Sequence, residues 1–288
     1  MTGGQAGGQG AVWEITPRRV GVFDTVVDVW RHRRLLRYLA LRSLQKVYRR
    51  TVLGWLWIFI NPLFPLALRA LIFGGLIGVT SEGIPYFLFL IAGSIAWDSF
   101  ASSLMWGTRG LEMNRHLVDQ IYVPRALLPF GNSSPALVDF AIKAAVLVLA
   151  VAYYAATDDR LYVRTGLPML WAVVALVLVF TLSTGLAFFT SIWGETGRDM
   201  RFTLGQVLSI WYLLTPVLYP LSQVPERYRD WMLANPLAIL VETFKWGLFG
   251  IGEFRPVAFG VTGGAIVALL LAGLAYFARA EAQAIEER

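Results

Sequence analysis

The sequence lacks cysteine altogether and carries little charge for its length. Of its 288 residues only 15% are charged, whereas soluble domains usually carry about 25%. Without cysteine, neither a disulfide framework nor thiolate chemistry is possible. The missing charge is concentrated in long apolar blocks, and the chain is 57% hydrophobic with a mean hydropathy of +0.58. This pattern is typical of a membrane protein that crosses the bilayer several times.

Several catalytic signatures are also missing. The sequence contains no G-x-x-x-x-G-K-[ST] phosphate loop, no H-E-x-x-H and no G-x-S-x-G. Its two histidines, His32 and His116, are far apart and too few for a zinc site. The pair Asp158–Asp159 is interpreted as a solvated turn. We therefore expect no cofactor, metal or catalytic residue in this chain.

The apolar blocks predict six membrane helices. Hydrocarbon offers no partners to backbone N–H and C=O groups, and the blocks lack the alternation of β-barrel strands. Each block is near the roughly 20 residues needed to cross about 30 Å. The predicted spans are Leu53–Val79, Tyr86–Trp106, Leu127–Ala156, Leu167–Trp193, Phe202–Pro220 and Pro256–Ala278.

The fold class is therefore all-α integral membrane protein. We divide the chain into a flexible tail over 1–22, an amphipathic interface helix over 23–52, a six-helix transmembrane domain over 53–279 and a tail over 280–288. Seventeen of the 25 Lys and Arg residues fall before the first span, in the even-numbered connections or in the tail, and six fall on the other side. The positive-inside rule then places both termini in the cytoplasm.

Residues 24–50 are too charged to span a membrane and predict an amphipathic helix in the interface. Its apolar side is expected at Leu36, Ala40, Leu44 and Val47. The basic side has two interpretations: an anchor on anionic lipid, or a surface for a phosphate-bearing substrate or acidic partner. The candidate head-group residues are Arg31, Arg34, Arg42, Lys46, Arg49 and Arg50.

Two connections are longer and more mixed than plain linkers. The cytoplasmic stretch 107–130 has polar and apolar faces, which favours a short helix that docks on another protein. The outward stretch 221–255 predicts interfacial or re-entrant helices broken near Asn235–Pro236, either as aromatic anchors or as an outer gate. The candidate docking residues are Leu111, Glu112, Asn114, Arg115, His116, Leu117 and Asp119.

Ionisable residues inside membrane spans are functional candidates by default, because an unpaired charge in hydrocarbon is costly. Arg69, Asp98, Asp139 and Lys143 lie inside predicted spans. Asp139 and Lys143 are four residues apart on one helix and can pair with each other. Asp98 can pair with Arg69 across two helices.

Four motifs in order resemble a known family. They are "RSLQKVYRRTVLGWLWIFINPL" at 42–63, "IYVPRALLPF" at 121–130, "GRDMRFTLGQVLSIWYLLTPVLYPLSQVP" at 197–225 and "NPLAILVETFKWGLFG" at 235–250. Together they resemble the membrane subunits of ABC-type polysaccharide exporters, over residues 35–278. Ser43 and Lys245 depart from the usual acidic residue and arginine of that pattern.

The resemblance implies a homodimeric channel in the bacterial inner membrane, driven by two copies of a separate ATP-binding subunit. ATP and Mg²⁺ would be bound by that subunit. Its substrate would be a glycan on a lipid carrier, usually polyprenyl pyrophosphate. Membrane lipids, but no nucleic acid, are further expected partners. Aromatic rings along the pore would stack on sugars. The pore-lining candidates are Trp55, Trp57, Phe59, Arg69, Trp97, Asp98 and Trp211.

Two alternatives remain open from the sequence. The same architecture would serve a permease for a drug or small lipid. An integral-membrane glycosyl- or phosphotransferase would need a site at the membrane face, for which Asp119 with His116 is the candidate pair.

Overall fold

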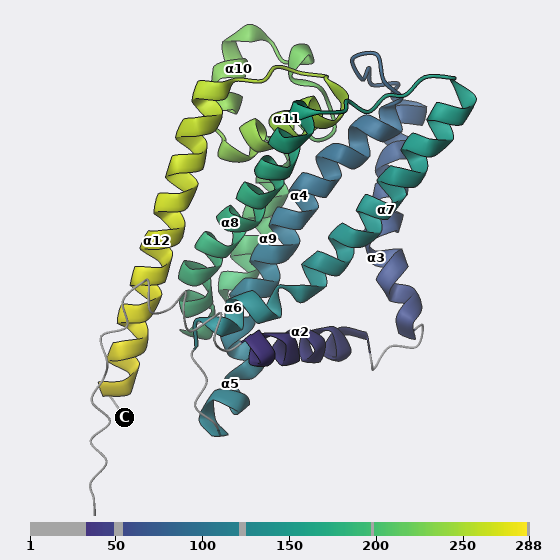
Figure 1. Cartoon of the computed structure of the whole chain (residues 1–288). Coiled ribbons are helices and arrows are strands. Elements are labelled where there is room, and N and C mark those ends of the chain that lie inside the picture. Colours follow the sequence, from purple (N-terminus) through teal and green to yellow (C-terminus); the bar gives the residue numbers. More distant parts are fainter. Residues whose placement is uncertain (1–32, 49–53, 121–124, 197–198, 287–288) are drawn as a thin grey trace, which may run out of the picture.

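A computed structural model describes residues 33–48, 54–120, 125–196 and 199–286, and these residues form helices without any strand. Figure 1 shows a bundle of long helices with shorter helices at both ends. The elements are α2 (Arg33–Tyr48), η1 (Gly54–Leu56), α3 (Trp57–Arg69), the π-helix η2 (Ala70–Leu76), α4 (Tyr86–Thr108), α5 (Gly110–Gln120), α6 (Leu127–Asn132), α7 (Ser134–Thr157), α8 (Leu167–Thr196), α9 (Asp199–Leu213), η3 (Leu221–Gln223), α10 (Glu226–Leu233), α11 (Pro236–Phe249) and α12 (Pro256–Glu286).

Five helical segments in the described residues are long and apolar enough to cross a membrane. They agree with five predicted spans to within a few residues, except that the second continues into α5. The segments are Gly54–Leu76, Tyr86–His116, Leu127–Thr157, Leu167–Gly194 and Pro256–Ala280.

The predicted fifth span differs from the structure at its far end. Helix α9 stops at Leu213 rather than at Pro220. Pro216 lacks an N–H and disfavours helical backbone at Thr215, so the helix ends in a turn. Its 15 residues rise only about 22 Å. A complete crossing would also need the turn that follows, and the count of six spans stays a prediction.

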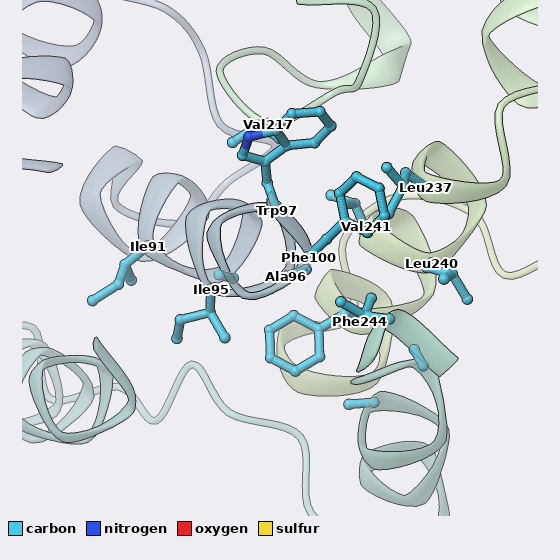
Figure 2. Packing of buried hydrophobic residues seen from close by; sticks show 14 of the residues in the cluster. Ile91, Ile95, Ala96, Trp97, Phe100, Val217, Leu237, Leu240, Val241 and Phe244 are labelled. Carbon is cyan, nitrogen blue, oxygen red and sulfur yellow. The ribbon is translucent and has the colours of Figure 1, made fainter. Parts of the chain in front are cut away.

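Helix α4 is the centre of the bundle. It packs against α7, α8, α9 and α11, and most of its residues are buried. Figure 2 shows Phe100 of α4 beside Leu237 and Val241 of α11, and Trp97 of α4 beside Val217. Apolar residues lie on all of its sides, as expected of a helix surrounded by protein. The core therefore positions every residue that α4 carries, including Asp98.

Helices α8 and α12 approach closely because both carry glycine at the crossing. A Cβ on Gly273 would lie 2.7 Å from the backbone oxygen of Gly185. Small residues at such crossings let membrane helices pack backbone against backbone.

The short helices divide between two ends of the bundle (Figure 1). Helices α2, α5 and α6 lie at one end with the C-terminal part of α12, and we call this the α2 end. Helices α10 and α11 lie at the opposite end, which we call the α10 end. The predicted break near Asn235–Pro236 is confirmed: Asn235 accepts a hydrogen bond from Leu237 N at 3.0 Å and caps α11, with Pro236 as its first residue.

Helix α2 lies across the bundle and packs on α6 and α7. Its most buried residues are Leu39 and Ser43, whereas the predicted apolar stripe ran through Leu36, Ala40 and Leu44, which are half-buried. The packed face is rotated because α2 rests on protein. Gly131 of α6 lets Leu39 approach closely, since a Cβ there would lie 2.8 Å from the Leu39 Cβ.

A buried polar junction holds the α2 end together. Ser43 donates to Asn132 Oδ1 at 2.8 Å, and Asn132 Nδ2 donates to Trp106 O at 2.7 Å. Ser134 donates to Ala40 O at 2.9 Å. These bonds join α2, α4, α6 and α7, and Ser43, the departure from the family pattern, serves one of them.

The Asn132→Ala variant should lower the free energy of unfolding by about 1–3 kcal/mol, because Ser43 and Trp106 O lose a buried partner. Thermal unfolding of the purified protein in one detergent measures this. Gln45→Ala on the exposed face of α2 is the control. Equal unfolding temperatures for the two variants would contradict the junction.

Candidate functional site

A charged cluster lies between three of the spanning segments. Asp98 on α4 accepts from Lys143 Nζ of α7 at 2.7 Å and from Arg69 Nη1 of α3 at 3.5 Å. The pairing of Arg69 with Asp98 that the sequence suggested is therefore present. Asp98 and Arg69 keep 21% and 26% of their side-chain surface exposed. One carboxylate thus holds two cations at the side of the bundle.

The expected pairing of Asp139 with Lys143 is wrong. The Lys143 ammonium points to Asp98 instead, and Asp139 accepts from Ser102 Oγ of α4 at 3.3 Å. The bond from Lys143 to Asp98 gives Asp98 a second cation. A pairing of Lys143 with Asp139 within α7 would leave Asp98 with Arg69 alone. Spacing along one helix could not reveal this, because Asp98 and Lys143 are 45 residues apart.

Four aromatic rings from α4 and α9 lie beside the charged cluster. Trp97 contacts Trp211 at a centroid distance of 6.4 Å and Tyr212 at 5.4 Å, and Phe100 contacts Trp211 at 5.3 Å. The guanidinium of Arg69 lies 4.8 Å from the centre of the Tyr212 ring. The charges and the rings are therefore one site, since Arg69 contacts both.

Arg69 also marks a change in helix type. It is the last residue of α3, and the next seven residues form the π-helix η2. Tyr86 packs against this segment at Gly74, where a Cβ would lie 2.6 Å from a Tyr86 ring carbon. π-Helical turns often occur at functional positions.

The pore-lining candidates fall into two groups. Arg69, Trp97, Asp98 and Trp211 belong to the site described above. Trp55 and Phe59 lie on the exposed side of η1 and α3, 70% and 54% exposed, and Trp57 is half-buried. Trp97 is only 4% exposed, so within one chain its ring is covered by neighbouring rings. A pore-lining role for either group stays a prediction.

The docking candidates divide between two faces of α5. Leu111 and Asn114 are buried, and Asn114 Nδ2 donates to Gly110 O at 2.9 Å. Glu112, Arg115 and His116 are exposed. Glu112 pairs with Arg201 at the start of α9 at 3.1 Å, which links α5 to α9. Leu117 and Asp119 belong to α5, but their side chains lie outside the described part.

Only part of the candidate head-group surface falls within the described residues. Arg34 is exposed and Arg42 is half-buried on α2. The side chain of Lys46, and Arg31, Arg49 and Arg50 entirely, lie outside the described part. The predicted tail over 1–22 lies outside it as well, and so do residues 287–288 of the predicted tail over 280–288, whereas α12 continues to Glu286.

A buried ion pair stabilises the α10 end. Lys245 Nζ lies 3.4 Å from Glu242 Oε1, donates to Pro216 O and sits 3.7 Å from the centre of the Phe89 ring. Burial raises the pKa of Glu242 and lowers the pKa of Lys245, while each charge opposes the shift of the other. Lys245 thereby anchors α11 to the turn that ends α9.

The sequence of most of this helical bundle matches a known family. The profile of the ABC-2 type transporter family matches residues 34–249. The chain belongs to the ABC-2 type transporter family. The match runs from α2 to the end of α11, so it contains the charged cluster, the aromatic rings and α5.

Individual relatives of this ABC-2 chain carry more specific names. The O-antigen export system permease protein RfbA of Myxococcus xanthus is 31% identical over 224 residues, 76% of this chain and 82% of that protein. The polysialic acid transport protein KpsM of Escherichia coli is 26% identical over 71% of this chain and 77% of its own. The inner membrane transport permease YadH of Escherichia coli K12 is 26% identical over 82% and 93%.

Sequence reasoning missed two members of the ABC-2 site. Tyr212 follows Trp211 directly in the sequence, and Phe100 lies three residues after Trp97. A search for aromatic residues near the two tryptophans would therefore have found both. Asn132 and Ser43 gave no comparable signal, because a polar residue near a helix end is usually solvated.

The Asp98→Asn variant should destabilise the protein by about 3 kcal/mol, because two cations lose their carboxylate. This is the lower end of the range for a broken buried pair, since Asp98 is 21% exposed. Lys143→Met should cost less, because Asp98 and Arg69 still neutralise each other. Thermal unfolding in detergent compares the variants.

The control for these variants is Glu253→Gln, which breaks the exposed Arg255–Glu253 pair and should change stability by less than about 1 kcal/mol. If Lys143→Met proved more harmful than Asp98→Asn, Asp98 would not be the shared partner.

Proposed function

We propose that this chain is the permease subunit of an ATP-driven exporter that moves a lipid-linked polysaccharide, carried on polyprenyl pyrophosphate, across the bacterial inner membrane. The proposal rests on the fact that relatives named for glycan transport align with most of this chain. RfbA of Myxococcus xanthus, named for O-antigen export, and KpsM of Escherichia coli, named for polysialic acid transport, each match most of this chain. The working unit would be a homodimer with two ATP-binding subunits.

The α2 end supports contact with an energy-supplying subunit. Helix α5 presents Glu112, Arg115 and His116 on its exposed face, while Leu111 and Asn114 fix it to the bundle. A helix that is packed on the bundle in this way can pass a movement of a docked partner to the spanning helices. The Glu112–Arg201 pair provides a direct route from α5 to α9. The sequence contains no phosphate loop, so nucleotide would bind on the partner.

The basic character of α2 supports an anionic head group at the same end. Arg33, Arg34 and Arg37 are exposed there. Guanidinium groups form charge-assisted hydrogen bonds with phosphate oxygens. With both termini in the cytoplasm, this surface would face the leaflet in which the carrier is loaded.

The deletion strain should lose its surface polysaccharide and accumulate lipid-linked glycan inside the cell, because the only route to the outer face is removed. Gel analysis of surface glycan and of the extracted lipid fraction measures both. The wild-type gene should restore the surface glycan, and its tagged product should copurify an ATP-binding subunit.

A second allele, Arg115→Glu/His116→Glu, should fail to restore export and should lose the ATP-binding subunit while retaining the wild-type unfolding temperature. Arg160→Glu, an exposed change in the loop between α7 and α8, is the matched control and should restore export. An unchanged surface glycan in the deletion strain would overturn the proposed function.

Single-cysteine labelling should report opposite sides for the two ends. Because the chain has no cysteine, Asp230→Cys should react with a membrane-impermeant maleimide in intact spheroplasts, and Arg115→Cys only after lysis. Both positions are exposed, whereas the buried Leu240→Cys control should stay unlabelled. Labelling of position 115 in intact spheroplasts would reverse the proposed orientation.

A further inference from the structure

A pocket of about 630 Å³ opens at the α10 end, between the last turn of α9, the turn around η3, and α10. Four aromatic residues line it together with the amides of Gln223 and Asn235. The aromatic residues are Trp211, Tyr219, Tyr228 and Trp231. Its volume lies within the range of small-ligand sites, about 300–1,000 Å³.

The walls of the pocket are fixed by hydrogen bonds. Trp211 Nε1 donates to Asn235 Oδ1 at 2.9 Å, and Tyr219 donates to Leu213 O at 2.6 Å. Arg229 Nη2 donates to Val224 O at 3.3 Å and so ties α10 to the turn beside it. A pocket whose walls are held in this way loses little conformational freedom when a ligand binds.

Trp231 stands at the pocket without a partner of its own. The residue is 81% exposed, and among the described residues its side chain makes no hydrogen bond or ring contact. Tyr228 is half exposed, and Arg227 covers one face of its ring at 4.5 Å. Two ring surfaces are thus available to a ligand.

The surroundings of the pocket favour a hydroxyl-rich ligand over an acyl chain. Helix α10 carries Glu226, Arg227, Arg229 and Asp230 within eight residues. A helix with that much charge borders water or head groups, since hydrocarbon would penalise it. A ligand that comes from water yet offers apolar faces to aromatic rings is a sugar ring, whose C–H groups stack on the ring while its hydroxyls bond amides.

The pocket is also continuous with the aromatic rings of the candidate site, because Trp211 belongs to both. We propose that this pocket binds one or two sugar units of the exported glycan as they reach the α10 end, with Trp231 and Tyr228 as stacking surfaces. This inference rests on the proposed function and assigns it a second contact with the glycan, separate from the head-group surface on α2.

The test uses the full chain in phosphatidylcholine nanodiscs, because a maltoside detergent would itself present sugar to the pocket. The probe is the strain's own surface polysaccharide, freed from lipid by mild acid, cut to short oligosaccharides and tritiated at the reducing end. Equilibrium dialysis measures Kd. The Tyr228→Leu/Trp231→Leu variant should bind about tenfold more weakly, since each ring contributes about threefold.

Three further variants distinguish stacking from general damage. Trp231→Phe keeps a ring and should bind with the wild-type Kd, whereas Trp231→Leu should bind about threefold more weakly. Trp193→Leu, which removes an exposed tryptophan of α8, should leave Kd unchanged. Only variants that keep the unfolding temperature of the wild type are compared.

Equal affinity in the wild type and the double variant would overturn the pocket, and Trp231 would then be a membrane anchor. The absence of measurable binding by the wild type would also overturn it. If deletion of the gene does abolish the surface glycan, either of these results leaves the proposed function unchanged. Sugar binding that depends on Trp231, in a chain whose deletion leaves the glycan unchanged, would overturn the function and keep the pocket.

Discussion

The carboxylate of Asp98 is the interaction on which the arrangement of the spans depends. It lies on α4, the most enclosed helix, and binds cations from α3 and α7. Helix α3 has few buried residues of its own, so the Arg69 contact is a large share of what ties it to the bundle. Because Arg69 also stacks on Tyr212 of α9, a movement of α3 would displace the aromatic rings.

The two ends of the molecule use polar groups in different ways. At the α2 end, Ser43 and Asn132 join short helices through neutral hydrogen bonds, and basic residues are left exposed. At the α10 end, Lys245 and Glu242 are buried as a pair and hold α11 against the turn after α9. A charged exposed end suits a partner or head group, and a braced opposite end suits a pocket with fixed walls.

Much of the fold could be predicted from sequence because hydrocarbon restricts the choices. Long apolar blocks had to be helices, and five of the predicted spans match to within a few residues at nearly every end. The break at Asn235–Pro236 followed from local chemistry. The end of α9 was misplaced because apolar residues continue beyond Pro216, and composition alone cannot show that the backbone has already turned.

The candidate site could be predicted only in part. Arg69, Asp98 and Lys143 could be identified as candidates from the sequence alone, because charge is rare inside a span. The sequence also determined the helical class, the positions of the spans and the basic segment before them. Only the tertiary structure decided that Lys143 bonds Asp98 rather than Asp139, and that Leu39 and Ser43 face the bundle. The reason is physical: local spacing defines neighbours along one helix, whereas a charge or a packed face is satisfied by whichever helix lies across from it.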